Sequence, residues 1–130
     1  MQYLSTRTPD HRVSLSTALQ EGLAPDGGLY VPERFPDLGP EAFDGCETIE
    51  AVAERLLRPF VEGDVLAEAL PGICEAMFGF PVPLREIGRK TSVLELFHGP
   101  TAAFKDVGAR FLADSLARLN EGAEQPLTIL

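Results

Sequence analysis

The chain has 130 residues, 45% of them hydrophobic, so it is long enough for one modest globular domain with its own core and too short for two. Its net charge of −9 disfavours contact with the phosphate backbones of nucleic acids, although a helix start or a single cation can still bind an anionic cofactor. Neither a basic and apolar N-terminal leader nor an apolar run near the roughly 20 residues needed to cross a bilayer is present, so we expect a cytoplasmic chain with no membrane or nucleic-acid partner.

The N-terminal third predicts short strands around one helix. Residues 2–7 are expected to form a short strand, and residues 13–21 a short helix that Ser14 caps and Gly22 ends. A tight Gly-Gly turn then leads into a second short strand at 29–31, which a proline ends.

The middle of the chain predicts two helices. Thr48 is a candidate N-cap for a helix over 49–61, whose apolar residues fall on one stripe. Asp64 is a candidate cap for a second helix over 65–77, which Pro71 should split or kink because proline lacks the backbone N–H and clashes with the preceding turn.

The pattern changes after the proline-rich linker at 79–83. An apolar strand is expected at 93–97, too apolar to have one face in water, followed by an amphipathic helix over 104–120 that Thr101 could cap. A further strand is expected at 127–130. Strand, helix and strand in this order predict a right-handed parallel βαβ unit and an α/β fold whose sheet is incomplete within these residues.

The remaining reactive side chains lack the spacing of a site. Cys46 and Cys74 are interpreted as packing residues, and with His11 and His98 far apart in the sequence no metal site is expected. Residues 5–7 could contribute to an anion site, but an arginine near a terminus is usually solvated.

Lys105 is the main candidate for chemistry because it is predicted to lie in the first turn of a helix. The helix start carries partial positive charge, which opposes an ammonium group and favours the neutral amine, a nucleophile that can form a Schiff base with a carbonyl. Pyridoxal phosphate is the most common carbonyl partner of such a lysine. Gly108 and Ala109 leave room beside the amine for a flat ring. The alternative is a solvated lysine whose stem covers apolar neighbours.

Two segments carry a family resemblance. Residues 94–111, LELFHGPTAAFKDVGARF, resemble the cofactor-lysine segment of the threonine synthase family, which belongs to the fold-type II pyridoxal-phosphate enzymes. The separate stretch within 3–32, which includes GLAPDGGLYVP, resembles the N-terminus of the same family and stands at about the family's spacing from the first segment.

The resemblance implies a threonine synthase N-terminal domain over 1–90 and the start of a pyridoxal-phosphate-binding α/β domain over 91–130. It also implies a lyase that converts O-phospho-L-homoserine and water to L-threonine and phosphate, with Lys105 as Schiff-base lysine and as general acid and base. The family's loop for the substrate carboxylate and its cradle for the cofactor phosphate would follow Leu130, so we expect these 130 residues alone to be inactive. A phospho-lyase of different outcome remains open, as does a catalytically dead paralogue that acts as an interaction module. The unfinished sheet edge would favour self-association.

Four further residues near Lys105 each have two interpretations. His98 follows the predicted strand, where α/β sheets bind ligands, or is a polar loop residue. Thr101 could contact a phosphate or cap the helix. Phe104 could contact the cofactor, although a core position is the simpler interpretation. Asp106 could orient Lys105, but an ion pair with Arg110 is the simpler interpretation.

Overall fold

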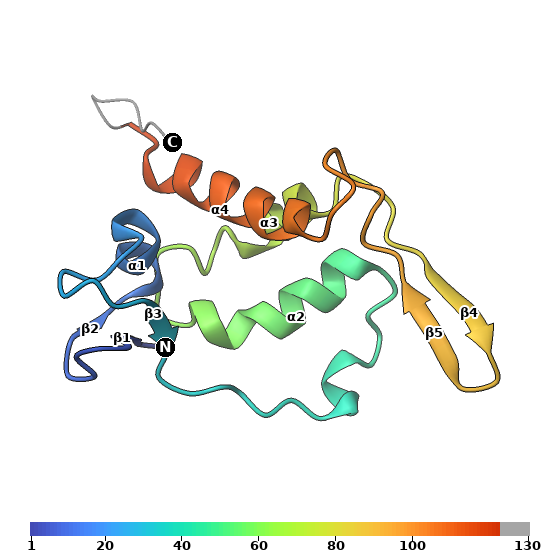
Figure 1. Cartoon of the computed structure of the whole chain (residues 1–130), viewed down its shortest axis with the longest axis horizontal. Coiled ribbons are helices and arrows are strands. Elements are labelled where there is room, and N and C mark those ends of the chain that lie inside the picture. Colours follow the sequence, from blue (N-terminus) through green and yellow to red (C-terminus); the bar gives the residue numbers. More distant parts are fainter. Residues whose placement is uncertain (123–130) are drawn as a thin grey trace.

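The computed structural model describes residues 1–122 and confirms the predicted mixture of helices and short strands in small, incomplete sheets (Figure 1). The strand expected at 127–130, and with it the parallel βαβ unit, lies outside the described residues. Within that range the helices are α1 (Leu15–Glu21), the 3₁₀ helix η1 (Pro40–Phe43), α2 (Ile49–Val61), α3 (Leu70–Met77) and α4 (Lys105–Leu119). The strands are β1 (Tyr3–Ser5), β2 (Arg12–Val13), β3 (Tyr30–Pro32), β4 (Leu84–Gly88) and β5 (Thr91–Leu94). No helix in residues 1–122 combines the length and the apolar character needed to cross a membrane.

The N-terminal sheet has the strand order β2-β1-β3, and both pairs are antiparallel. Helix α1 follows β2 and has the predicted ends. Ser14 Oγ accepts a hydrogen bond from the backbone N–H of Thr17 at 3.1 Å, and Gly22 ends the helix with a positive φ of 70°. The sequence therefore predicted this helix and its caps correctly.

Helices α2 and α3 form the centre of the core, and α3 packs against both α2 and α4. The predicted N-cap of α2 is confirmed, since Thr48 Oγ1 accepts from Ala51 N at 3.2 Å. The helix predicted at 65–77 begins only at Leu70, so that Pro71 stands in its first turn, where a missing N–H leaves no bond unmade. Among residues 1–122 the core consists of ten buried side chains: Tyr3, Leu15, Ala18, Ala53, Val61, Leu66, Leu70, Ile73, Cys74 and Met77.

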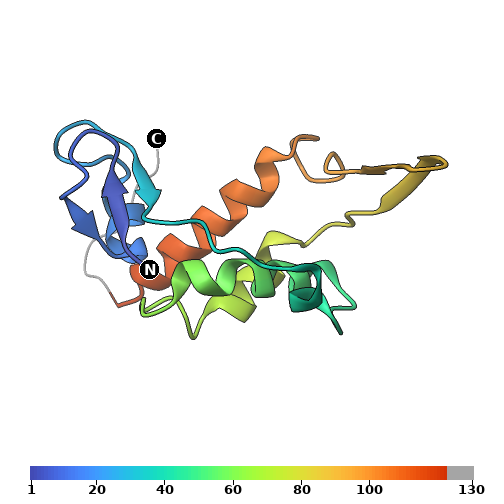
Figure 2. The same ribbon diagram turned by 90° about the horizontal axis from the view of Figure 1, so that it is seen from below.

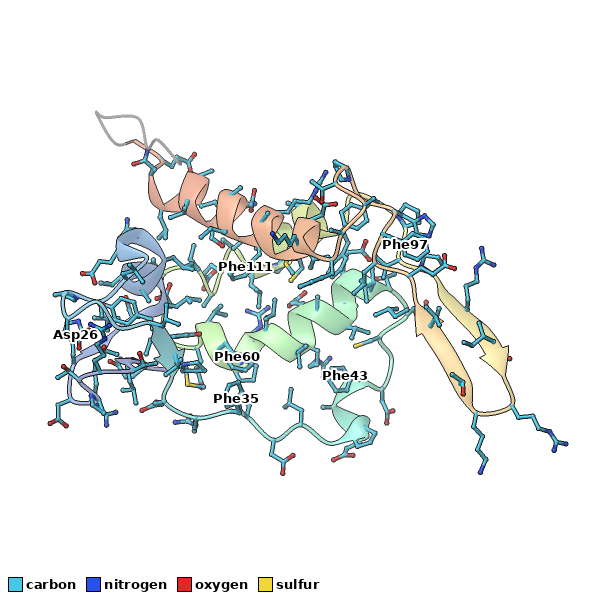
Figure 3. All side chains as sticks on the ribbon, viewed as in Figure 1. Asp26, Phe35, Phe43, Phe60, Phe97 and Phe111 are labelled. Carbon is cyan, nitrogen blue, oxygen red and sulfur yellow. The ribbon has the colours of Figure 1, made fainter. Side chains whose placement is uncertain are left out.

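Helix α4 lies across this core on the side of α3 and also contacts α1. Leu116 is buried, and Phe111, labelled in Figure 3, is partly buried on the side of α4 that faces α2. Asp114 and Arg118, one turn apart on this helix, form an ion pair at 2.6 Å. Phe104 was predicted to belong to the core, and this is wrong: its side chain is 70% exposed, because it precedes the helix and lies beyond the end of the packed layer.

Strands β4 and β5 form an antiparallel hairpin, residues 84–94, that extends away from the helices (Figures 1 and 2). The sequence predicted a buried strand at 93–97, and two features of that prediction are wrong. The strand ends at Leu94, and both strands of the hairpin are exposed along their whole length. β5 pairs with β4, which follows the proline-rich linker and was not predicted, and β4 and β5 contact each other far more than they contact any described helix.

Candidate active site at the start of helix α4

Lys105 lies in the first turn of α4, as predicted, and is the first residue of that helix; it lines an open cavity of about 490 Å³. The cavity lies between the base of the hairpin and the first turns of α4. Its other lining residues are almost all apolar: Ile49, Phe78, Val82, Leu94, Leu96, Phe104, Val107 and Gly108. Lys105 is thus the one charged residue in an otherwise apolar lining, and it is exposed.

Gly108 provides space one turn after Lys105. A Cβ atom added at Gly108 would meet no atom within 4 Å, so the absence of a side chain leaves this part of the cavity free. Ala109, which the sequence analysis grouped with Gly108, does not line the cavity. The cavity therefore has room for a flat group beside Lys105 on one side of the helix only.

The loop before Lys105, residues 99–104, is tied to the helix by Asp106. Thr101 donates two hydrogen bonds to this carboxylate, from its backbone N–H to Oδ2 at 2.9 Å and from Oγ1 to Oδ1 at 2.9 Å. Thr101 is therefore not the N-cap of α4, because its hydroxyl is engaged with Asp106; the N-cap position belongs to Phe104, with no side-chain cap. Ala102 has a φ of 55°, a left-handed conformation that is strained for a residue with a Cβ atom.

The predicted ion pair between Asp106 and Arg110 is also wrong. Arg110 Nη1 donates to the carbonyl oxygen of Ala76 at 3.0 Å, and its guanidinium lies over the ring of Phe80, 5.4 Å from the centroid. This geometry satisfies a carbonyl in the last turn of α3, where helical carbonyls lack internal partners. Arg110 therefore does not pair with Asp106, whose carboxylate bonds to Thr101 of the loop instead.

His98 lies outside the cavity lining. Its Nε2 is 2.7 Å from Oε2 of Glu95, and its ring lies against that of Phe97, with 4.7 Å between the centroids. Of the four residues predicted to touch a cofactor, Lys105 and Phe104 line the cavity, whereas His98 and Thr101 do not. Sequence reasoning missed Ile49, Phe78 and Val82, which no local motif could reveal because they come from different parts of the chain.

Two of the three N-terminal residues considered for an anion site, Ser5 and Arg7, instead bond to Asp26. Ser5 Oγ lies 2.8 Å from both carboxylate oxygens, and Arg7 Nη1 donates to the backbone oxygen of Asp26 at 2.9 Å. Hydrogen bonds from Thr8, from the backbone of Gly28 and from Ser5 lower the pKa of Asp26 to about 2. A charged carboxylate already fills this position, so a second anion is disfavoured there.

The cysteines have surroundings that fit packing. Cys74 is 1% exposed in the core, and burial raises the pKa of its thiol to about 11. Cys46 is partly exposed, with Sγ 3.7 Å from the carbonyl oxygen of Ala51. No cluster of three or more His, Cys, Asp or Glu side chains suited to a metal ion occurs in residues 1–122.

Comparison with known proteins connects this cavity to a family. Residues 2–78 match the model of the threonine synthase N terminus. Threonine synthase from Serratia marcescens is 36% identical over 132 residues, an alignment that covers 100% of this chain and 30% of that protein. The chain thus spans about 30% of the length of the curated relatives that it matches.

Two solved structures extend the match to the fold. The crystal structure of threonine synthase from Escherichia coli aligns with a TM-score of 0.81 and 30% identity, over 92% of this chain and 28% of that one. The structure of pyridoxal-phosphate-bound threonine synthase from Brucella melitensis aligns with a TM-score of 0.80 and 38% identity, over 93% of this chain and 28% of that one. With a family model matching more than half of its residues and a shared fold, the chain belongs to the threonine synthase family and corresponds to the N-terminal part of these enzymes.

Proposed function

We propose that this chain carries the cofactor lysine, Lys105, of a pyridoxal-phosphate-dependent threonine synthase. The observation that carries the proposal is an amine at the first position of a helix, beside an open apolar cavity. Family membership and the pyridoxal phosphate bound to the Brucella melitensis relative support it.

The residues around Lys105 fit the ring of this cofactor. Leu94, Leu96 and Val107 supply apolar walls, and the empty space at Gly108 leaves room for a flat group next to the amine. Phe104, exposed at the cavity rim, could pack against an aromatic ring. Lys105 would hold the cofactor covalently through its amine.

The proposed reaction converts O-phospho-L-homoserine and water to L-threonine and phosphate. Pyridoxal phosphate, when bound, supplies an electron-withdrawing ring that makes protons on the substrate's carbon atoms removable. Lys105 moves these protons, acting as base and acid at the α, β and γ carbons, while phosphate leaves from Cγ and water adds at Cβ.

A second part of the proposal concerns the 130 residues taken alone. Lys105 is the one cationic side chain of the cavity lining in the described part of the chain, and if it is engaged with the cofactor, no cation remains there for the cofactor phosphate. We therefore infer that these residues bind the cofactor loosely and do not turn over substrate by themselves. Stoichiometric loading that survives dialysis would contradict this inference.

The test of the proposed function is reductive labelling. The chain is incubated with pyridoxal phosphate, reduced with borohydride and mapped by mass spectrometry of its peptides. Lys90 is a matched internal control, since the sequence has just two lysines and Lys90 lies exposed in the hairpin turn. We expect more label on Lys105 than on Lys90 or the N-terminal amine, and equal labelling would contradict the proposal.

Other parts of the sequence interpretation stay predictions. These predictions are His98 and Thr101 as cofactor contacts, the cytoplasmic location and self-association. For the domain boundary, we propose the linker at 79–83. The matched N-terminal region ends at residue 78, and the boundary predicted at residue 90 would separate β4 from β5, which pair with each other. Lys105 beside an open cavity does not favour the interaction-module alternative.

A further inference from the structure

Asp106 is a buried charge that the proposed chemistry does not use. Its side chain is 6% exposed although it stands in the first turn of α4, and a buried carboxylate is costly unless hydrogen bonds compensate it. Its carboxylate accepts two hydrogen bonds, and both come from Thr101, five residues earlier, rather than from a cation. The carboxylate is thus engaged in tying the loop to the helix.

The loop is shaped around this contact. A Cβ atom at Gly99 would overlap the carboxylate of Asp106, so only glycine allows the loop to approach so closely. Ala102 donates from its backbone N–H to the carbonyl oxygen of Gly99 at 3.0 Å while it keeps its strained φ of 55°. A strained backbone persists only where its surroundings determine it, and the bonds between Asp106 and Thr101 are the side-chain contacts that fix this loop.

The same loop sets the geometry of the cavity. Leu96, just before the loop, and Phe104, at its end, line the cavity together with Lys105. A loop that opened would move Phe104 and loosen the first turn of α4, where Lys105 is the first helical residue. The position of the amine relative to Leu96 therefore depends on the closed loop.

We propose that Asp106 is a positioning residue, which holds loop 99–104 closed through Thr101 and thereby keeps the Lys105 amine at the cavity. This inference rests on the proposed function of Lys105. It assigns Asp106 no contact with substrate or cofactor; the carboxylate acts through the loop.

A simpler role for Asp106 has to be separated from this one. A carboxylate in the first turn of any helix stabilises it by interaction with the helix dipole, whatever the loop does. Thr101→Val separates the two roles, because valine has nearly the shape of threonine, removes the hydroxyl donor and leaves Asp106 in place. Thr101 is exposed, so this substitution does not disturb the core.

The experiment measures the ratio of label on Lys105 to label on Lys90 after reaction with pyridoxal phosphate and borohydride. It compares the unaltered 130-residue chain with Thr101→Val, Thr101→Ser and Asp106→Asn. Asp114→Asn is the matched control, because it removes a carboxylate from the same helix that pairs with Arg118 at 2.6 Å and not with the loop. Far-ultraviolet circular dichroism checks that each variant keeps its helices.

We expect Thr101→Val and Asp106→Asn to lower the labelling ratio by at least about threefold, the low end of the range for one lost hydrogen bond. Thr101→Ser, which restores the hydroxyl donor, should keep the ratio of the unaltered chain, and so should Asp114→Asn.

Three results would overturn the proposal. An unchanged ratio in Thr101→Val would contradict the positioning role alone and leave the proposed function intact. An equal loss in Thr101→Ser would show that the hydroxyl of residue 101 is not what holds the loop. Equal labelling of Lys105 and Lys90 in the unaltered chain would contradict the proposed function itself, and the positioning role with it. If Asp106→Asn loses its helices, Thr101→Val decides the question.

Discussion

Helix α3 and the β4–β5 hairpin are both rich in apolar residues, yet they lie in opposite environments. Leu70 and Ile73 of α3 are 0% exposed, whereas Leu84 and Ile87 of the hairpin are 66% and 67% exposed. α3 lies between α2 and α4, while the hairpin projects beyond them (Figure 2). Apolar surface stabilises a fold only when other atoms replace water around it, so α3 contributes to stability and the hairpin contributes little.

This difference explains where the candidate site lies. Helix α4 has its later turns on the core, with Leu116 buried, and its first residue, Lys105, on the open side beside the base of the hairpin. A packed helix holds the backbone of a reactive residue in a fixed position, and the open side gives its side chain access to a ligand. Chemistry at the border of the two regions therefore combines rigidity with exposure.

The largest expected effect contrasts one leucine from each region. Leu70→Ala removes fully buried methyl groups and leaves a cavity, so we expect the free energy of unfolding to fall by about 2–5 kcal/mol. Leu84→Ala is the matched control at an exposed position, where we expect a change within about 0.5 kcal/mol. Urea denaturation followed by circular dichroism measures both. Equal losses in the two variants would mean that the hairpin is packed in solution and that the contrast between the regions is wrong.

The packed region was largely predictable from local sequence signals. Ser14, Gly22 and Thr48 mark helix ends through hydrogen bonds and backbone conformations that involve only their near neighbours. Such signals need no knowledge of the rest of the fold. The start of α3 was predicted wrongly because a proline such as Pro71 is compatible with either a kink or a first turn of a helix. Tertiary packing around Leu70 decides between the two.

The open region was predicted less well because its apolar pattern alone does not determine whether the strands are buried. Residues 93–97 were expected to be buried, since apolar side chains usually are, but burial depends on what covers a strand. The site shows the same division. The position of Lys105 in the first turn followed from the helix pattern, whereas the bond partners of Asp106 and Thr101 depend on how the loop folds back, a feature that side-chain spacing along a helix does not encode.

A smaller effect is expected at a serine in the packed region. Ser115 Oγ is buried and has no hydrogen-bond partner among the residues that the structure describes. Ser115→Ala removes this unpaired group and places a better helix former in α4, so we expect stability to rise by about 1 kcal/mol. Ser92→Ala, at an exposed hairpin position, is the control and should change little. Thermal unfolding measures both, and a loss of stability in Ser115→Ala would mean that the hydroxyl is bonded in solution.

The smallest expected effect is a pH dependence at the edge of the N-terminal sheet. In the folded chain the pKa of Asp26 is about 2, against 3.8 for the ordinary group, because Thr8, Gly28 and Ser5 donate hydrogen bonds to its charged form. The unfolded chain thus takes up a proton at a higher pH than the folded chain does. The stabilisation by Asp26 is complete above the unfolded pKa and is lost as the pH falls through the folded pKa.

Asp26→Asn tests this dependence by comparison at several pH values. Unfolding by urea should show Asp26→Asn to be less stable than the unaltered chain at about pH 5, and the gap should close as the pH approaches about 2. Asp37→Asn, which alters an exposed loop carboxylate, controls for the change in net charge. A gap that stays constant over this range would mean that Asp26 acts through the shape of its turn, not through its charge. In that case the N-terminal sheet, like the helical core, would owe its stability to contacts that do not titrate.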